Sequence, residues 1–233
     1  MSSKPLDKSK ADRLLSDLNS DPETFKRKGL SNKLLEQFFR GYSLDNLRSL
    51  LRHNDDRVLS VGMWIASELP SEASTLLDDV IAVSKHSDPY IRFYALDVIL
   101  LGTRAARRED FIHVVKGIED PNGAVSKHAL TFLSRADNDQ VIGAITHLER
   151  EKPDSPHLPE LHALVEARSV KADDVERMIL GDDALRRKYG VAIADRINDL
   201  YPNLIRVACN SDDELVRSVA QRMSERRGLN QGE

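Results

Sequence analysis

Apolar residues recur along most of the chain at the spacing of three and four residues that forms one face of an α-helix. The clearest window runs from residue 58 to 69, and its apolar face comprises Val58, Val61, Gly62, Ile65, Ala66 and Leu69. No segment alternates apolar and polar residues between glycine-rich hairpin turns, as paired strands would. The pattern therefore predicts an all-α fold.

The helical pattern also repeats. Each of five segments contains the end of one predicted helix, an Asp-containing turn and the start of a second helix. The first apolar residue of the second helix, called the opening residue below, is Val58, Ile91, Val125, Leu185 or Val216. The opening residues are separated by 33, 34, 60 and 31 residues, and 60 is close to two periods. A period of this length predicts stacked helical hairpins. A further hairpin is expected around residues 138–168, with residues 151–160 as an enlarged turn between its helices.

The turn residues fit this interpretation. Asp88-Pro89 and Asp120-Pro121 each predict an N-cap followed by proline at the first helical position. Pairs of aspartates occupy equivalent turns at 55/56, 182/183 and 212/213. We interpret them as helix caps rather than as paired catalytic carboxylates, because a carboxylate there satisfies free amides and complements the helix dipole.

Residues 88–92, Asp-Pro-Tyr-Ile-Arg, resemble the Asp-Pro-x-Val-Arg signature that opens the second helix of a HEAT repeat, and residues 213–217 are a looser match. The resemblance covers residues 44–227 and implies a right-handed superhelix of about six HEAT-like hairpins, with the second helices lining its concave side. Leu59 and Ser126 occupy the arginine position in two other repeats, so the Asp–Arg ladder between neighbouring repeats is expected to be incomplete. Residues 1–43 are helical but out of register and predict an N-terminal helical cap, while residues 228–233 predict a frayed tail.

Composition narrows the class of protein. The 233 residues are 40% hydrophobic and 31% charged, too apolar for a disordered chain and too polar for a membrane protein. The 34 Lys and Arg residues nearly balance the 38 Asp and Glu residues, so no global basic field attracts nucleic acid. No apolar stretch that would act as a secretory signal is visible near residue 1, which predicts a cytoplasmic location. The single cysteine, Cys209, excludes an intramolecular disulfide and is expected to be a buried structural thiol.

Motifs for catalysis are absent from the sequence: it has no phosphate-binding loop, dinucleotide-binding glycine motif, nucleophile elbow or zinc-protease motif. We therefore predict no enzyme activity and no cofactor. His157, His162 and Glu166 could supply three ligands to a divalent metal. However, Pro156 and Pro159 leave the geometry of the loop undefined and no fourth ligand is evident, so no metal site is predicted.

Aromatic residues instead point to a binding surface. Ten of the twelve lie in the first 132 residues. The positions two and six residues after the opening residue of each second helix lie outside the core face. They include Trp64, Phe93, Asp97, Lys127 and Thr131. Exposed aromatic residues with a polar rim are typical of partner surfaces. We predict Trp64 and Phe93 as anchors and Asp97 and Lys127 as determinants of specificity, whereas Met63, Leu96 and Leu130, five residues on, are expected to pack on a neighbouring repeat.

An alternative comes from the basic residues near the C-terminus. Residues 186–227 contain nine Lys or Arg and six Asp or Glu. Arg186, Arg187, Arg217 and Arg222 could face phosphates, as in a HEAT-like DNA-binding or alkylated-DNA repair protein. The Trp-Asp signature of HEAT-like DNA glycosylases is missing, since Trp64 is followed by Ile65, and the basic residues are segregated from the aromatic platforms that base flipping requires.

The leading hypothesis is therefore a non-enzymatic solenoid that binds another protein on its concave face. It is similar, most specifically, to HEAT-like immunity proteins that bind and occlude a cognate toxin in the cytoplasm of bacteria. The sequence predicts neither a nucleic acid nor a membrane as the partner, and it leaves the oligomeric state open.

Overall fold

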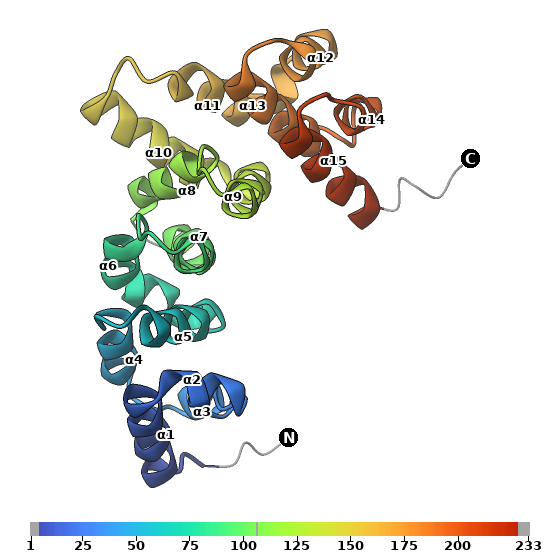
Figure 1. The fold of residues 1–233 in the computed structure, drawn as a ribbon. Coiled ribbons are helices and arrows are strands. Elements are labelled where there is room, and N and C mark those ends of the chain that lie inside the picture. The colour runs from blue at the N-terminus through green and yellow to red at the C-terminus, as the bar shows by residue number, and fades with distance from the viewer. Residues whose placement is uncertain (1–4, 106, 228–233) are drawn as a thin grey trace. The chain divides into compact units, whose positions relative to one another are not determined.

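The structure is a computed structural model that describes residues 5–105 and 107–227. Every regular element in these ranges is a helix, which confirms the all-α prediction (Figure 1). Contacts divide the chain into two compact units, Met1–Gly102 and Thr103–Glu233, and each unit is described by itself. The predicted frayed tail, 228–233, lies outside the described residues. Across those residues, no helix is both long and apolar enough to cross a bilayer.

The first unit begins with three helices, α1 (Lys8–Ser20), α2 (Pro22–Arg27) and α3 (Ser31–Phe39). They occupy the region predicted as an N-terminal cap. Two helical hairpins follow, α4 (Leu44–Leu51) with α5 (Asp56–Ser67), and α6 (Ala73–Val83) with α7 (Pro89–Ala105), whose last residues belong to the second unit. A short 3₁₀ helix, η1 (Pro70–Glu72), joins the two hairpins.

The second unit contains four more hairpins. They are α8 (Ile112–Gly117) with α9 (Gly123–Arg135), α10 (Asn138–Glu151) with α11 (His157–Val165), α12 (Ala172–Leu180) with α13 (Ala184–Arg196), and α14 (Asn203–Cys209) with α15 (Glu214–Arg226). Two 3₁₀ helices, η2 (Arg108–Phe111) and η3 (Ala167–Ser169), precede α8 and α12. The six helix pairs agree with the predicted number, and the pair α10 and α11 is the hairpin expected around residues 138–168.

Aspartate caps begin four of the second helices, as predicted. Each capping carboxylate accepts an amide N–H from the first turn of its own helix, at 2.8 to 3.0 Å; the caps are Asp55, Asp88, Asp183 and Asp213. These bonds satisfy amides that have no partner within the helix. One aspartate of each predicted pair is therefore explained as a cap.

Two details of the repeat register differ from the prediction. Asp120 does not cap α9, because Asn122 accepts the amide N–H groups of the first turn and the helix starts at Gly123. The Asp120 carboxylate instead accepts the N–H of Asn122 at 2.8 Å. In the other second helices the opening apolar residue lies three positions after the cap. In α13 the cap is Asp183 and that position holds the exposed Arg186, so Leu185 is not equivalent to the other opening residues.

Side chains from the second helices also close the turns that precede them. Arg92, Arg187 and Arg217 each donate to the carbonyl oxygen of the residue six positions earlier, at 2.6, 2.9 and 2.6 Å. Where the sequence has Ser126 instead of arginine, the hydroxyl donates to the Ile118 carbonyl at 2.5 Å. Arg187 also lies 3.2 Å from the Asp213 carboxylate of the next hairpin, which is one rung of the expected Asp–Arg ladder.

Histidines connect two turns of the first unit. His53 Nδ1 accepts the N–H of Asp55 at 3.0 Å, and His86 Nδ1 accepts the N–H of Asp88 at 3.1 Å in the equivalent turn. His86 Nε2 lies 3.3 Å from the carboxylate of Asp56, in the preceding hairpin. The turns of α4–α5 and α6–α7 therefore have the same internal hydrogen bond and also contact each other.

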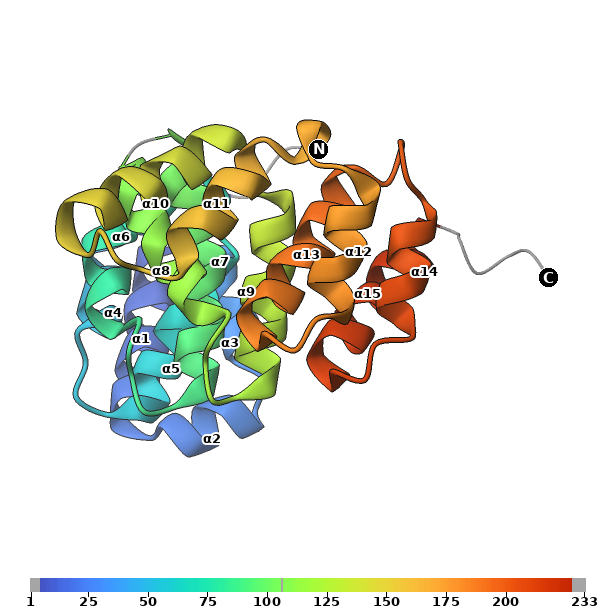
Figure 2. The ribbon, with the colours of Figure 1, turned by 90° about the horizontal axis from the view of Figure 1, so that it is seen from above.

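The interiors of both units are closely packed. In the second unit α13 contacts α9, α11, α12, α14 and α15, and Figure 2 shows α12 and α13 side by side. In α10, a Cβ placed on Gly143 would lie 2.4 Å from the carbonyl carbon of Arg108 in η2. Only glycine allows this contact between α10 and the backbone of η2, because the obstacle is main chain rather than a flexible side chain.

We therefore expect Gly143→Ala to lower the free energy of unfolding by about 1–3 kcal/mol, the usual cost of overpacking a closely packed interior. The matched control is Gly123→Ala, at the start of α9, where an added Cβ meets no atom within 4 Å. Urea unfolding followed by circular dichroism measures both variants. Equal stability of the two would contradict the packing described for α10 and η2.

Candidate functional site

Aromatic side chains line the outer side of the second helices in the first unit. Trp64 on α5 and Phe93 on α7 are half-buried, and Tyr90 at the start of α7 is 68% exposed. The neighbouring Met63 and Leu96 are buried, as expected for residues that pack inside the repeat stack. The off-core positions of α5 and α7 thus carry aromatic side chains that remain partly exposed.

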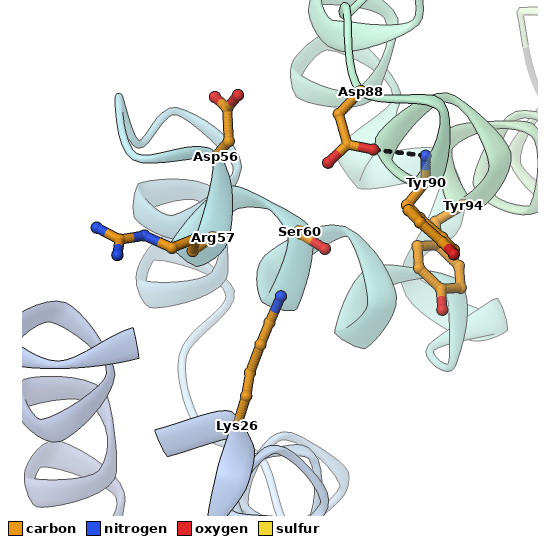
Figure 3. Close-up of a pocket in the computed structure, with 7 residues that line it drawn as sticks. All are labelled: Lys26, Asp56, Arg57, Ser60, Asp88, Tyr90 and Tyr94. Atoms are coloured by element: carbon orange, nitrogen blue, oxygen red, sulfur yellow. Dashed lines mark hydrogen bonds between the residues drawn. The ribbon is translucent and has the colours of Figure 1, made fainter. Parts of the chain in front are cut away.

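A pocket of about 320 Å³ opens between these two helices and α2 (Figure 3). Its lining residues are Lys26 of α2, Asp56, Arg57 and Ser60 of α5, and Asp88, Tyr90 and Tyr94 at the start of α7. In Figure 3 the Lys26 side chain extends toward α5, and the rings of Tyr90 and Tyr94 lie together beneath α7. The pocket therefore has a cationic side on α2 and an aromatic side on α7.

Most charges around the pocket are paired within the unit. The Arg57 guanidinium lies 2.6 Å from the Asp55 carboxylate, and its hydrogen bonds hold the pKa of Asp55 well below the usual range. Asp56 faces His86, and Asp88 accepts the amide N–H of Tyr90. These bonds hold the charged groups in the walls of the pocket in place.

Tyr94 lies at the edge of an acidic region. Its pKa is raised, first by partial burial and then by the negative charge of Asp97 and Glu68. The hydroxyl is therefore protonated at neutral pH and can donate a hydrogen bond. The ring packs edge-to-face against Phe93, with the centroids 5.8 Å apart. Phe93 and Tyr94 thus form one rigid aromatic pair on α7.

The other two predicted partner residues belong to the second unit. Lys127 and Thr131 are half-buried on α9, and the Thr131 hydroxyl donates to the Lys127 carbonyl oxygen at 2.9 Å. Trp64, Phe93 and Asp97 are thus grouped on α5 and α7, whereas Lys127 and Thr131 are one turn apart on α9. Their role in partner binding remains a prediction in both units.

Arginines of the predicted phosphate-facing group have intramolecular partners. Arg186 lies 3.2 Å from the Glu160 carboxylate. Arg187 and Arg217 donate to the turns before their helices, as described above, and both are only half-exposed. Arg222 is exposed on α15. Phosphate binding by Arg187 or Arg217 would therefore compete with bonds that hold the turns together.

His157 is not in a flexible turn, as the sequence suggested, but begins α11 and is buried. Its Nδ1 lies 3.0 Å from the Tyr189 hydroxyl and its Nε2 lies 2.9 Å from the Glu119 carboxylate. His162 instead faces Glu149 at 3.7 Å. The three candidate metal ligands therefore do not converge. Within the described parts of the chain, no group of three His, Cys, Asp or Glu residues is arranged to hold a metal ion.

The Glu119–His157–Tyr189 chain joins three successive hairpins of the second unit. Burial lowers the pKa of His157, although the Glu119 carboxylate opposes this effect, and burial raises the pKa of Tyr189 well above its ordinary value. A neutral imidazole satisfies the geometry, because the tyrosine hydroxyl donates to Nδ1 and Nε2–H donates to the carboxylate. Tyr189 is completely buried, so the chain acts as a structural joint.

None of the seven residues that line the pocket was predicted as a site residue, and Lys26, Tyr90 and Tyr94 show why. Tyr94 occupies a position in α7 whose equivalent in α5 is the buried Val61, so the helical pattern assigned it to the core. Tyr90 precedes the repeat register, and Lys26 comes from the out-of-register helices. The signal that could have found the tyrosines is their spacing of four residues, which places both rings on one side of α7.

Cys209 is half-buried, and burial raises the pKa of its thiol.

No protein-family model and no curated protein sequence matches this chain. Among solved structures, the chain is similar to a designed armadillo repeat protein, with 15% sequence identity and a TM-score of 0.49. The similarity covers 91% of this chain and 98% of the designed protein.

The buried imidazole predicts a pH dependence of stability. Because the pKa of His157 is lowered on folding, the unfolded chain binds more protons below about pH 6.5, and stability is lost as the pH falls through this value. We expect the loss of unfolding free energy between about pH 7.5 and pH 5.5 to be smaller in His157→Gln than in the wild type. Urea unfolding at several pH values measures it. The control, His162→Gln, removes an exposed histidine and keeps the wild-type slope; an unchanged slope in His157→Gln would contradict the burial effect.

Proposed function

We propose that this chain is a protein-binding module of helical repeats that holds its partner on the aromatic face of the first unit and catalyses no reaction. We define the aromatic face as Trp64 on α5 with Tyr90, Phe93 and Tyr94 on α7. The observation that carries the proposal is that these four aromatic side chains of α5 and α7 are all partly exposed and that two of them, Tyr90 and Tyr94, line one pocket.

The physical chemistry of binding supports this choice. Trp and Tyr contribute large contact area with few rotatable bonds, and they are enriched among the residues that dominate protein interfaces. The neighbouring core positions are filled by other residues, Met63 and Leu96, which are buried. A face of this kind is costly to leave in water unless a partner covers it.

In its narrower form, we propose an immunity-type protein that occludes a toxin. The aromatic face would cover the active or substrate-entry surface of the toxin. The charges of Asp97 and, in the second unit, of Lys127 would set specificity. The support for this form is a loose resemblance to HEAT-like immunity proteins in size, in solenoid architecture and in the wide face of the second helices.

The decisive variant is Trp64→Ala. We expect it to weaken the complex with the partner by at least ~2 kcal/mol, because it removes the largest aromatic side chain of the face. The partner is obtained by affinity capture from the source cells, identified by mass spectrometry and bound again as a purified protein in calorimetry. Thermal unfolding of the variant should remain close to that of the wild type.

Tyr201→Ala is the matched control, because Tyr201 is a partly exposed aromatic residue of the second unit. It should leave the affinity unchanged. Capture is repeated after nuclease treatment, and a partner lost with the nucleic acid would favour the DNA-binding alternative. Normal binding by Trp64→Ala would remove the aromatic face from the interface.

A further inference from the structure

We propose that the pocket between α2, α5 and α7 is a binding site for a neutral saccharide, with one sugar ring resting on Tyr90. This ligand is separate from the protein partner, so the inference goes beyond the proposed function and does not depend on it. The observation that carries it is a single pocket of about 320 Å³ whose lining combines aromatic rings with hydroxyl, ammonium and carboxylate groups.

The charges of the pocket disfavour ionic ligands. The lining contains two cations, Lys26 and Arg57, and two carboxylates, Asp56 and Asp88, so that it is neutral as a whole. An anionic ligand would lie near the two carboxylates, and a cationic ligand would lie near the ammonium and guanidinium groups. Like charges at short range in a small pocket are unfavourable. A neutral ligand avoids both forms of repulsion.

Several polar groups of the lining retain capacity for hydrogen bonds. The Lys26 ammonium and the Ser60 hydroxyl have no partner among the residues that the structure describes. One carboxylate oxygen of Asp88 accepts an amide N–H of its own helix at 2.8 Å (Figure 3), and one of Asp56 lies 3.3 Å from His86 Nε2. The second oxygen of each carboxylate is left to accept from a ligand. Donors and acceptors therefore both surround the pocket.

A sugar ring suits such a mixed lining. Each of its hydroxyl groups can donate one hydrogen bond and accept others, so one ring can bond to ammonium, hydroxyl and carboxylate groups together. A wholly apolar ligand would leave these groups unpaired. A peptide amide or a nucleobase has its donors and acceptors at a few fixed positions in one plane, whereas the hydroxyl groups of a sugar project around the whole ring.

The tyrosines supply the apolar side of the site. Tyr90 is 68% exposed and lines the pocket together with Tyr94, and Figure 3 shows their rings lying together beneath α7. The face of a phenol ring carries negative potential, and the C–H groups on one face of a sugar ring pack well against it. Small-ligand pockets span roughly 300–1,000 Å³, so a pocket of about 320 Å³ suits a single ring.

The test uses saturation-transfer NMR of the full chain with a panel of neutral methyl hexosides and methyl N-acetylglucosaminide. We expect at least one of these sugars to bind and Tyr90→Ala to raise its dissociation constant about tenfold, because the stacking surface is lost. Tyr90 is largely exposed, so the variant should keep the wild-type circular dichroism. Tyr201→Ala, at a partly exposed tyrosine of the second unit, is the matched control and should bind normally.

Further probes test the class of ligand. Glucuronic acid and glucosamine carry opposite charges and should both bind more weakly than the neutral sugars, so equal binding by either would overturn the neutral site. Adenosine and a neutral dipeptide amide are measured in the same way. Binding by one of them that depends on Tyr90, without binding by any sugar, would overturn the saccharide assignment. Failure of every neutral sugar to bind, or an unchanged affinity in Tyr90→Ala, would also overturn it.

The variant Trp64→Ala separates this inference from the proposed function. Trp64 does not line the pocket, so we expect this variant to bind the sugar as the wild type does. Loss of sugar binding in Trp64→Ala with a preserved fold would contradict the pocket as the binding site. Failure of the sugar test leaves the protein-binding face in place, and normal binding of the protein partner by Trp64→Ala leaves the saccharide site in place.

Discussion

A short helical hairpin has too little apolar surface to fold alone, and this constraint governs the whole structure. Each hairpin must bury its apolar stripe against the next one, so the residues between hairpins are committed to packing. Gly143 shows how close the contact becomes, since its α-carbon faces the backbone of η2 with no room for a methyl group. The outward side of a second helix is free of this demand. Trp64 and Tyr90 on that side can therefore be used for binding.

The same constraint explains why the turns are built alike. A hairpin stacks correctly only if the second helix starts at a fixed place and direction, and the capping aspartates define that start. Arg92 and Arg217 then bond to the preceding turn from within their helices, and Ser126 does so over a shorter reach. Different side chains thus fulfil one geometric requirement, which is why the sequence signature of the repeat varies while the hairpins persist.

The fold was predictable because it depends on local patterns. Helical spacing, a period near 33 residues and Asp-containing turns are all visible in one sequence, and they led to six hairpins. The pocket was less predictable, because the helical pattern cannot separate a half-exposed Tyr94 from a buried valine in the equivalent position. Long-range bonds were not predictable at all. His157 finds Tyr189 32 residues later and Glu119 38 residues earlier, and no spacing rule connects them.

The central claim is that α5 and α7 form the surface that meets the partner. Amide hydrogen exchange of the full chain, measured with and without the purified partner, tests it most directly. The account predicts that new protection is concentrated in residues 57–68 and 88–97. Protection concentrated instead on α13 and α15, around Arg186 and Arg222, with α5 and α7 unchanged, would contradict it.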